Sequence, residues 1–320
     1  IELHTLGLRS PRGFLYEMSS FIRLVRRIRP DIIQGWMLHG NVAASLAGAC
    51  LDIPVFWGVR HSRLLRQTEK KANLFLQWLL GRASRFPARI IYNSHEGKRD
   101  HEGTGYCATR SLVIPNGFDG ARFAPSSTAR QAMRHSLAIP DDTVAIGMVA
   151  RYHPMKDHET FLEAAALLRK SHSQVVFLLV GRGCEPANAE LVSRINSLSL
   201  DGAVRLIGER SDVHELINAF DMGTLSSSSE GFANVIGELM CCAVPCVVTD
   251  VGDSAWIVGN AGVTVPSKDP LALCRGWTEL IDAGPLARQA MGQRARERIV
   301  ARFSIDAVAR EYEAAYLQCL

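Results

Sequence analysis

The sequence lacks the patterns that build several common kinds of site. No Cys-x2-Cys pair occurs, so a structural zinc site with closely spaced ligands is not expected. The longest uncharged run, residues 32–51, contains Gln34, His39 and Asn41 together with three glycines, which is too polar for a membrane-spanning helix. Aromatic residues make up only 7% of the chain. We therefore expect a soluble α/β protein.

The eight cysteines are scattered along the chain rather than paired. Three of them, Cys241, Cys242 and Cys246, lie in an apolar segment that runs from a helix into a strand. This pattern favours reduced thiols packed in a core, and it predicts a cytoplasmic protein.

Length and charge divide the chain in two. At 320 residues, about two domains are expected. Residues 1–115 hold 17 Lys and Arg against 8 Asp and Glu, whereas the remainder holds 19 against 24. Two basic clusters in the first half could contact anionic lipid at the inner face of the cell membrane or a phosphorylated acceptor, and a solvated helix face explains them equally well. They are Arg23, Arg26, Arg27 and Arg29, and Arg60, Arg63, Arg66, Lys70 and Lys71.

The second half alternates apolar runs of strand length with helical patterns. The alternation predicts a parallel sheet wound with crossover helices, whose ligands bind at the carboxyl ends of the strands. Strands are expected at 144–150, 175–180, 204–207, 222–225 and 246–249, with helices at 159–170 and 188–198.

The first half has the same pattern in shorter form, and no internal repeat is present. Strands are expected at 32–34, 55–57, 89–92 and 112–115, with helices at 41–50 and 70–82. A turn is expected at Pro115-Asn116-Gly117, and the polar segment 125–142 is interpreted as the connection between domains. The expected domains are therefore 1–124 and 125–302, followed by an amphipathic helix at 303–320 that packs back toward the first domain.

Two cations follow the strand at 144–150. Arg151 lies at its carboxyl end and Lys156 precedes the next helix. Arg can hold phosphate oxygens through two parallel hydrogen bonds, and Lys adds a compact charge, so the pair suits a diphosphate. A solvated loop is the alternative, but the position at a strand end favours the ligand site.

Glu230 and Glu238 flank a Gly-containing apolar turn that leads into a helix beginning near Ala233. Free backbone amides at a helix start bind anions, and a carboxylate in an apolar helix needs a polar contact. We expect both carboxylates, about two turns apart, to reach one elongated ligand. Gly181, in a Gly-x-Gly turn, and Arg210 follow neighbouring strands and are weaker signals of a site.

Two histidines are candidates for proton transfer in the first half. His61 follows the strand at 55–57, and His39 follows the strand at 32–34. A lone histidine is more often structural than catalytic, so the residues alone leave both interpretations open.

Four segments together resemble the family 4 glycosyltransferases, which use nucleotide sugars with retention of configuration and have the GT-B fold of two Rossmann-like domains. The segments are VIPNGFDGARFAP at 113–125, VARYHPMKDHETFLEAA at 149–165, RLIGERSDVHELINAFD at 205–221 and SSSSEGFANVIGELMCCAVPCVVTD at 226–250. Members usually begin with a further strand and Gly-rich loop, so the resemblance implies that about 60 residues of the first domain are absent and that this domain is incomplete.

The resemblance also implies roles for individual residues. Arg151 and Lys156 would hold the diphosphate, helped by the amides of Gly231, Phe232, Ala233 and Asn234. Glu238 would accept the ribose hydroxyls and Glu230 would contact the donor sugar. Arg210 and Gly181 would lie near the base, and His61 beside the sugar. The leaving phosphate would take the acceptor proton. Because the chain has no Asp-x-Asp pair, we expect no metal or other cofactor.

The implied function is transfer of a sugar, from a UDP-sugar rather than a GDP-sugar, to a glycan or lipid-linked acceptor of a bacterial surface polysaccharide. Two alternatives remain open at this point. One is a nucleotide-sugar epimerase on the same fold, and the other is a protein that binds nucleotide sugars without transfer.

Overall fold

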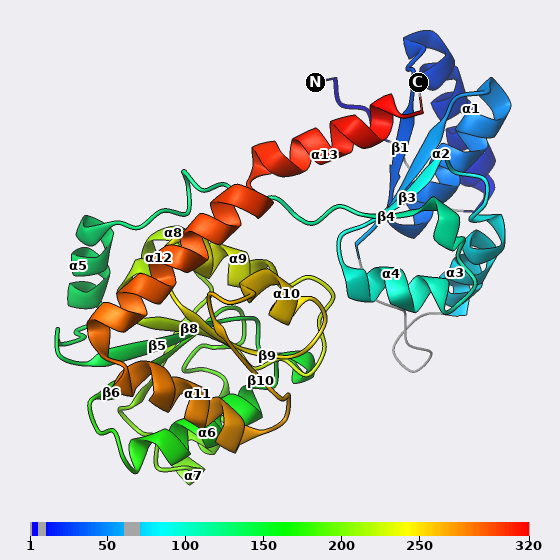
Figure 1. Cartoon of the computed structure of the whole chain (residues 1–320). Helices are drawn as coiled ribbons and strands as arrows, with labels where there is room; N and C mark the ends of the chain where they lie inside the picture. The colour runs from blue at the N-terminus through cyan, green and yellow to red at the C-terminus, as the bar shows by residue number, and fades with distance from the viewer. Residues whose placement is uncertain (1, 6–10, 61–70, 320) are drawn as a thin grey trace. The chain divides into compact units, whose positions relative to one another are not determined.

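A computed structural model of the chain describes residues 2–5, 11–60 and 71–319 (Figure 1). The chain forms two compact units. Unit 1 comprises Ile1–Pro115 with Arg310–Leu320, and unit 2 comprises Asn116–Ala309. None of the helices in the described residues is long and apolar enough to cross a lipid bilayer.

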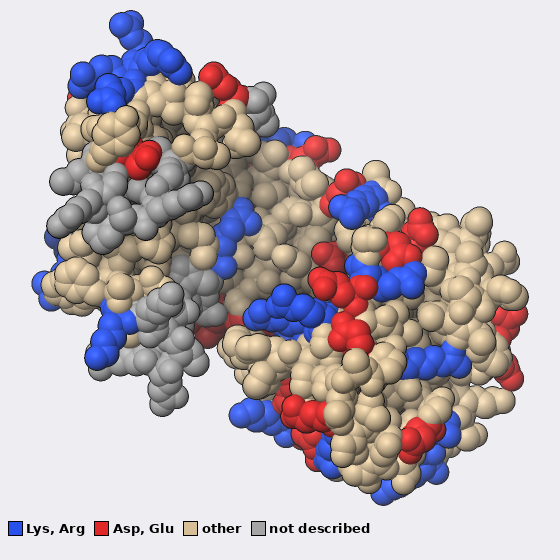
Figure 2. All heavy atoms as spheres, turned by 180° about the vertical axis from the view of Figure 1, so that it is seen from behind, with Lys and Arg blue, Asp and Glu red and all other residues tan. Residues whose placement is uncertain are grey.

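Unit 1 is built on a parallel sheet whose strands follow one another in chain order. They are β1 (Ile33–Trp36), β2 (Val55–Val59), β3 (Arg89–Tyr92) and β4 (Ser111–Val113). Its helices are α1 (Pro11–Ile28), α2 (Met37–Leu51), α3 (Lys71–Ala83) and α4 (His95–Glu102). All residues of β2 are buried, and Trp57 and Tyr92 are among the largest side chains of this core. Figure 2 shows Lys and Arg gathered on one end of this unit. Arg23, Arg26 and Arg27 of α1 are exposed.

Unit 2 contains a six-stranded parallel sheet in the order β10-β9-β8-β5-β6-β7. The strands are β5 (Val144–Val149), β6 (Val175–Val180), β7 (Val204–Gly208), β8 (Met222–Leu225), β9 (Cys246–Thr249) and β10 (Val263–Val265). The first strand is central, and later strands are added first on one side and then on the other, which is the doubly wound order of nucleotide-binding sheets. The order reverses between β5 and β8, so the loops that follow these two strands flank the switch point.

The helices of unit 2 pack against this sheet and form two apolar cores with it. They are α5 (Ser127–Ser136), α6 (His158–Arg169), α7 (Ala189–Ser197), α8 (Val213–Leu216), α9 (Asn234–Cys241), α10 (Ser254–Val258), α11 (Pro270–Asp282) and α12 (Gly284–Phe303), with α13 (Ile305–Leu317) continuing into unit 1. Cys241, Cys242 and Cys246 are buried free thiols, as predicted, and burial raises the pKa of each.

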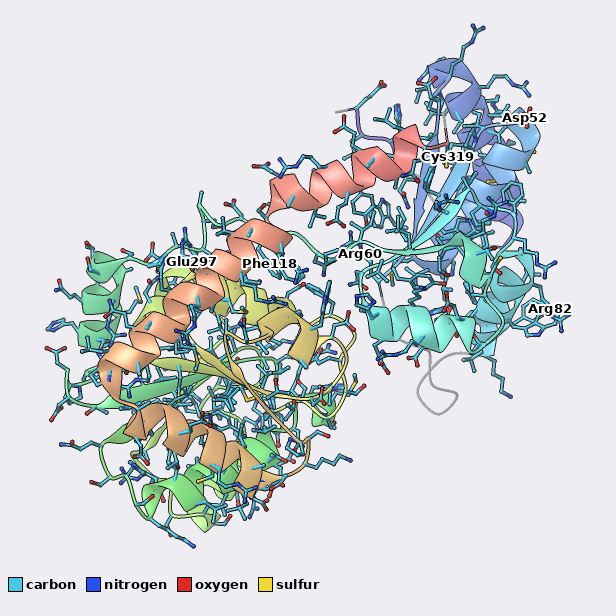
Figure 3. The ribbon with its side chains drawn as sticks, viewed as in Figure 1. Asp52, Arg60, Arg82, Phe118, Glu297 and Cys319 are labelled. Atoms are coloured by element: carbon cyan, nitrogen blue, oxygen red, sulfur yellow. The ribbon has the colours of Figure 1, made fainter. Side chains whose placement is uncertain are left out.

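The division between the units differs from the expected one. Unit 2 begins at Asn116 rather than at residue 125, because Phe118 is buried in the core of unit 2. Phe118, labelled in Figure 3, also exchanges backbone hydrogen bonds with Phe303 and Ile305. The segment 116–124 therefore belongs to the second unit.

The expected linker at 125–142 is also wrong in part, because it contains α5. The Ser126 hydroxyl caps this helix by accepting a hydrogen bond from the Ala129 amide. Pro125 and Ser126, which are typical of loops, here precede the first turn of a helix, whereas Pro140, Asp141 and Asp142 lie on the loop between α5 and β5.

The C-terminal segment is not one helix from 303 to 320. Helix α12 continues to Phe303, and α13 begins after a break at Ser304. Residues from Arg310 onward group with unit 1, where the Tyr316 ring packs edge-on against Phe56 and its hydroxyl bonds the Gln34 side chain at 3.1 Å.

Candidate active site in unit 2

Hydrogen bonds join the loops that follow β5 and β8 at the switch point. The buried Ser226 hydroxyl donates to the carbonyl oxygens of Lys156 and Asp157, at 2.9 and 3.0 Å. The Ser228 amide bonds the Met155 carbonyl at 2.9 Å. These contacts hold the loop that carries Lys156 against the loop that carries Glu230.

Lys156 and Glu230 form a direct ion pair. The Lys156 Nζ lies 2.5 Å from Glu230 Oε1, and the Ser227 hydroxyl donates to the same oxygen at 2.6 Å. Only 24% of the Lys156 side chain and 12% of the Glu230 side chain are exposed. The sequence pattern assigns these two residues separate contacts with a ligand and gives no sign of their pairing.

Lys156 is placed by the short 3₁₀ turn Pro154–Lys156, which ends at Asp157. Asp157 adopts a positive φ of 50° and caps α6 by accepting from the Thr160 amide at 3.1 Å. The exposed Arg151 lies at the carboxyl end of β5. Both predicted cations therefore lie on the loop after β5, as the strand pattern indicated.

Helix α9 begins at the predicted place. Ala233 is its N-cap residue and makes no side-chain hydrogen bond to the first turn. The side chain of Asn234, the first residue of α9, accepts a 2.7 Å hydrogen bond from the Asn116 amide group. The sequence identifies Asn116 only as part of a turn, and the Pro-Asn-Gly signal gives no indication of this contact.

An aromatic cluster lies behind this helix start. The rings of Phe118 and Phe232 stack at 6.1 Å, and Phe232 also packs near Phe303. Gly237 lies directly beneath Phe118, and a Cβ there would come within 2.1 Å of the ring. The cluster therefore fixes both the loop before α9 and the helix itself.

Glu238 lies one turn after Asn234, not two turns along a helix from Glu230 as expected. The reason is that Glu230 belongs to the loop rather than to the helix. Burial raises the pKa of Glu238 above its ordinary value, and the nearby Arg122 charge acts in the opposite direction. An ionised carboxylate here lacks the full stabilisation that water or a ligand hydroxyl would provide.

Gly181 is required by the backbone. It has a φ of +136°, and a Cβ would lie 2.3 Å from the Ala150 carbonyl oxygen. The turn is joined to the loop after β5 by a 2.7 Å bond from the Tyr152 amide to the Arg182 carbonyl. Gly181 thus allows the loop after β6 to pack against the loop that carries Arg151.

Arg210 lies on the loop after β7, the edge strand of the sheet. Its guanidinium donates two hydrogen bonds to Asp212, at 2.7 and 2.5 Å. The structure does not connect it to Lys156 or Glu230 through any contact in the described residues. Of the two histidines, His39 is an exposed residue of α2 in unit 1, and His61 lies outside the described residues.

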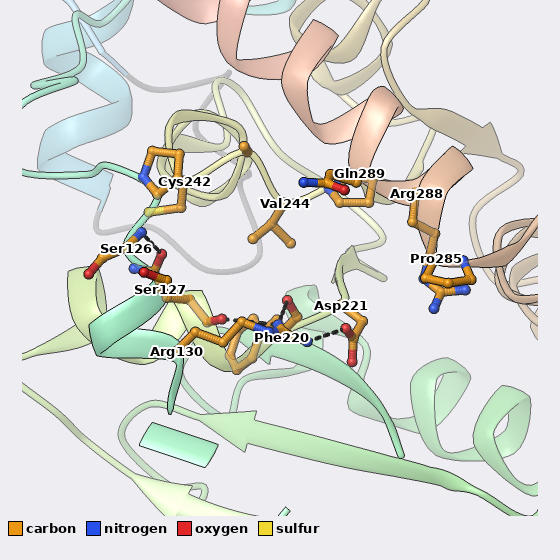
Figure 4. A pocket seen from close by; sticks show the side chains of 14 residues that line it. Ser126, Ser127, Arg130, Phe220, Asp221, Cys242, Val244, Pro285, Arg288 and Gln289 are labelled. Atoms are coloured by element: carbon orange, nitrogen blue, oxygen red, sulfur yellow. Dashed lines mark hydrogen bonds and ion pairs between the residues drawn. The ribbon is translucent and has the colours of Figure 1, made fainter. Parts of the chain in front are cut away.

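A cavity in unit 2 lies at the edge of the sheet opposite to the candidate site. It has a volume of about 450 Å³ and is lined by residues that precede β8 and β9, among them Asp221 and Pro245, and by Arg130 from α5 (Figure 4). Arg130 is bound to Asp221 at 2.6 Å. Because ligands of such sheets bind at the carboxyl ends of the strands, this cavity is separate from the candidate site.

The sheet order defines a Rossmann-like domain, and comparisons with known proteins identify the family. The model for Glycosyltransferase Family 4 matches residues 2–122, and the model for Glycosyl transferases group 1 matches residues 143–283. The chain belongs to these glycosyltransferases.

Two curated relatives illustrate the similarity. A UDP-Gal:alpha-D-GlcNAc-diphosphoundecaprenol alpha-1,3-galactosyltransferase of Escherichia coli is 26% identical over 90% of this chain and 75% of its own length. A D-inositol 3-phosphate glycosyltransferase of Kineococcus radiotolerans is 30% identical over 66% of this chain and 52% of its own length. The chain thus spans about half the length of several curated relatives that it matches.

Solved structures agree on the fold. HepE of Anabaena, crystallised in complex with UDP, matches with a TM-score of 0.84 and 24% identity, covering 96% of this chain and 84% of HepE. Sucrose-phosphate synthase of Thermosynechococcus elongatus matches with a TM-score of 0.76 and 19% identity, covering 100% of this chain and 82% of the synthase. The fold is GT-B, as predicted.

Proposed function

We propose that this chain is a retaining glycosyltransferase that takes a sugar from a nucleotide-diphosphate sugar, with UDP as the favoured nucleotide. The observation that supports this proposal most is the hydrogen bonding between the loops after β5 and β8. It brings Lys156 next to Glu230, on the loop that leads into α9. The relative from Escherichia coli acts on a UDP-sugar and a lipid-linked acceptor, and HepE binds UDP. We therefore propose a glycan or lipid-linked acceptor of a bacterial surface polysaccharide.

In the proposed reaction, Arg151 and Lys156 hold the diphosphate, and the first amides of α9 add their partial positive charge. Glu230 uses Oε1 to fix Lys156, and we assign Oε2 to a hydroxyl of the donor sugar. Glu238 accepts the ribose hydroxyls, Gly181 and Arg210 lie toward the base, and His61 toward the sugar.

The bond from the anomeric carbon to the phosphate oxygen breaks as the bond to the acceptor oxygen forms on the same face of the sugar. The acceptor proton moves to the leaving phosphate oxygen. Arg151 and Lys156 stabilise the negative charge that develops on the nucleoside diphosphate, so we propose that no metal is required.

We expect the purified chain to release UDP from a UDP-sugar, slowly with water and faster with an acceptor, and to the same extent in excess chelator. The measurement is product analysis by ion-exchange chromatography with and without chelator. Conversion of the donor sugar to an epimer without acceptor would instead identify an epimerase. Tight binding without any product would identify a binding protein, and activity that returned only with manganese would contradict the metal-independent mechanism.

Glu238→Gln separates donor binding from stability. Since folding raises the pKa of this carboxyl, its contribution to stability is present below its unfolded pKa and is lost as pH rises through the folded pKa. Above that folded pKa the free protein therefore carries an ionised, desolvated carboxylate. We expect Glu238→Gln to raise the Tm of the free protein while weakening UDP binding.

Loss of the hydrogen bonds to the charged Glu238 carboxylate should cost about 1.5–3 kcal/mol of binding free energy, which corresponds to a roughly tenfold to hundredfold increase in the Kd for UDP. Calorimetric titration with UDP measures the affinity, and a thermal melt measures the Tm. The matched control is Glu297→Gln on α12, an exposed glutamate (Figure 3) whose substitution should change neither quantity. In the native protein, UDP affinity should also fall as pH is lowered through the raised pKa of Glu238. Unchanged affinity in Glu238→Gln would remove the proposed ribose contact.

A further inference from the structure

Helix α3 of unit 1 is apolar on two opposite sides. Leu80 is buried in the core of unit 1 and Leu76 packs against that core. On the other side Phe75, Trp78 and Leu79 are 62%, 53% and 44% exposed. A helix at the surface of a globular domain normally presents polar residues to water, so this second apolar side is unusual.

The exposed residues form one continuous strip. At 100° per residue, Lys71, Phe75, Trp78, Leu79 and Arg82 fall within an arc of about 100° on the helix. The Phe75 and Trp78 rings stack at 5.9 Å, and the Arg82 guanidinium lies 5.0 Å from the Trp78 ring. Figure 3 shows Arg82 on the side of α3 that faces away from the sheet.

The chain after α3 extends this strip. Arg85 is exposed, and Phe86 is 48% exposed. We call Lys71, Phe75, Trp78, Leu79, Arg82, Arg85 and Phe86 the α3 surface. A cavity of about 640 Å³ adjoins it, and the guanidinium-bearing residues Arg82, Arg85 and Arg110 contribute to its lining.

Charge indicates what the α3 surface contacts. Residues 71–95 contain Lys71, Arg82, Arg85 and Arg89 and no Asp or Glu. Exposed aromatic and leucine side chains mixed with Lys and Arg are typical of helices that lie in the bilayer interface, where the rings enter the headgroup region and the cations attract anionic lipid.

We propose that the α3 surface docks unit 1 onto an anionic lipid bilayer. Phe75, Trp78, Leu79 and Phe86 enter the interface, and the three arginines of the adjoining cavity contact lipid phosphate groups. The docking requires no nucleotide and does not depend on the candidate site in unit 2. If the lipid-linked acceptor of the proposed function is correct, the same docking holds the enzyme at the surface where that acceptor lies.

The test is co-sedimentation of the whole chain with vesicles, in the absence of nucleotide sugar. We expect binding to vesicles of phosphatidylcholine with phosphatidylglycerol, and at least tenfold weaker binding to phosphatidylcholine alone. Phe75→Ser with Trp78→Ser should weaken binding to the anionic vesicles at least tenfold. Arg82→Glu with Arg85→Glu should remove the preference for anionic lipid.

Leu286→Ser is the matched control, because Leu286 is 80% exposed on α12 in unit 2 and its substitution should leave vesicle binding unchanged. Thermal melts identify any variant that is unfolded. If Phe75→Ser with Trp78→Ser does not fold, the variant with Arg82→Glu and Arg85→Glu provides the test. The proposal would be overturned if the native chain did not bind anionic vesicles. It would also be overturned if both double variants bound them as strongly as the native chain does. A dimer that dissociates with Phe75→Ser and Trp78→Ser, without vesicle binding, would also overturn it and identify the surface as a subunit interface.

Discussion

Replacing Lys156 with alanine is expected to lower kcat by roughly 10² to 10³-fold, the loss typical when one preorganised donor to a developing oxyanion is removed. Its Nζ lies 2.5 Å from Glu230 Oε1, and only 24% of the Lys156 side chain is exposed. The charge on the leaving diphosphate develops in the transition state, so kcat and kcat/KM should fall together while KM changes little.

Steady-state release of UDP measures this loss of kcat, and two other substitutions serve as comparisons. Lys156→Arg keeps the charge but not the compact ammonium, and we expect partial activity. Lys170→Ala removes an exposed lysine at the end of α6 and should leave kcat unchanged. A Lys156→Ala protein with kcat within threefold of the native value would show that the leaving group is stabilised elsewhere.

Replacing Asp221 with alanine is expected to destabilise unit 2 by about 3–5 kcal/mol, because it removes one partner from a buried ion pair. The Asp221 carboxylate accepts from Arg130 at 2.6 Å, from Arg134 at 3.0 Å and from the Ala145 amide at 2.8 Å. The Arg134 side chain is only 4% exposed and also donates to the Pro140 and Thr143 carbonyls. Without Asp221, its charge would stay buried with no opposite charge.

Urea denaturation followed by circular dichroism measures the loss. The control is Asp212→Ala, which breaks the more exposed pair with Arg210 and should cost no more than about 1 kcal/mol. Equal shifts for the two variants would mean that Arg134 is held by backbone carbonyls alone. The same network shapes the cavity at the amino-terminal edge of the sheet (Figure 4), which supports a structural role for that cavity.

Much of the fold of unit 2 follows from the sequence because its central strands are buried on both faces. Continuous apolar runs of this length between turn signals favour strands over helices, and β6, β8 and β9 begin and end at the predicted residues. Strand β10 has only three residues, too few for the pattern to indicate it. The pattern also does not indicate helix α5, because its stabilising contacts, such as those of Arg134, come from residues far along the chain.

The position of the candidate site follows from the sequence for a similar reason. Parallel strands end at one edge, so the strand pattern alone assigns Arg151, Lys156 and Glu230 to neighbouring loops. The pairing of Lys156 with Glu230 depends on the Ser226 hydroxyl joining the two loops, and no spacing rule contains that contact. The role of Asn116 depends likewise on how the chain after unit 1 packs onto α9.

We propose that the carboxyl edge of the sheet in unit 2 binds a nucleotide sugar. A thermal-shift panel of UDP- and GDP-sugars tests it most directly, because a ligand of the folded state raises Tm with the logarithm of its concentration over its Kd. We expect a concentration-dependent rise in Tm with a UDP-sugar, a smaller rise with GDP-sugars, and a much reduced rise in a protein that carries both Arg151→Ala and Lys156→Ala. A chain whose Tm no nucleotide sugar raises, or a double variant shifted as much as the native protein, would contradict it.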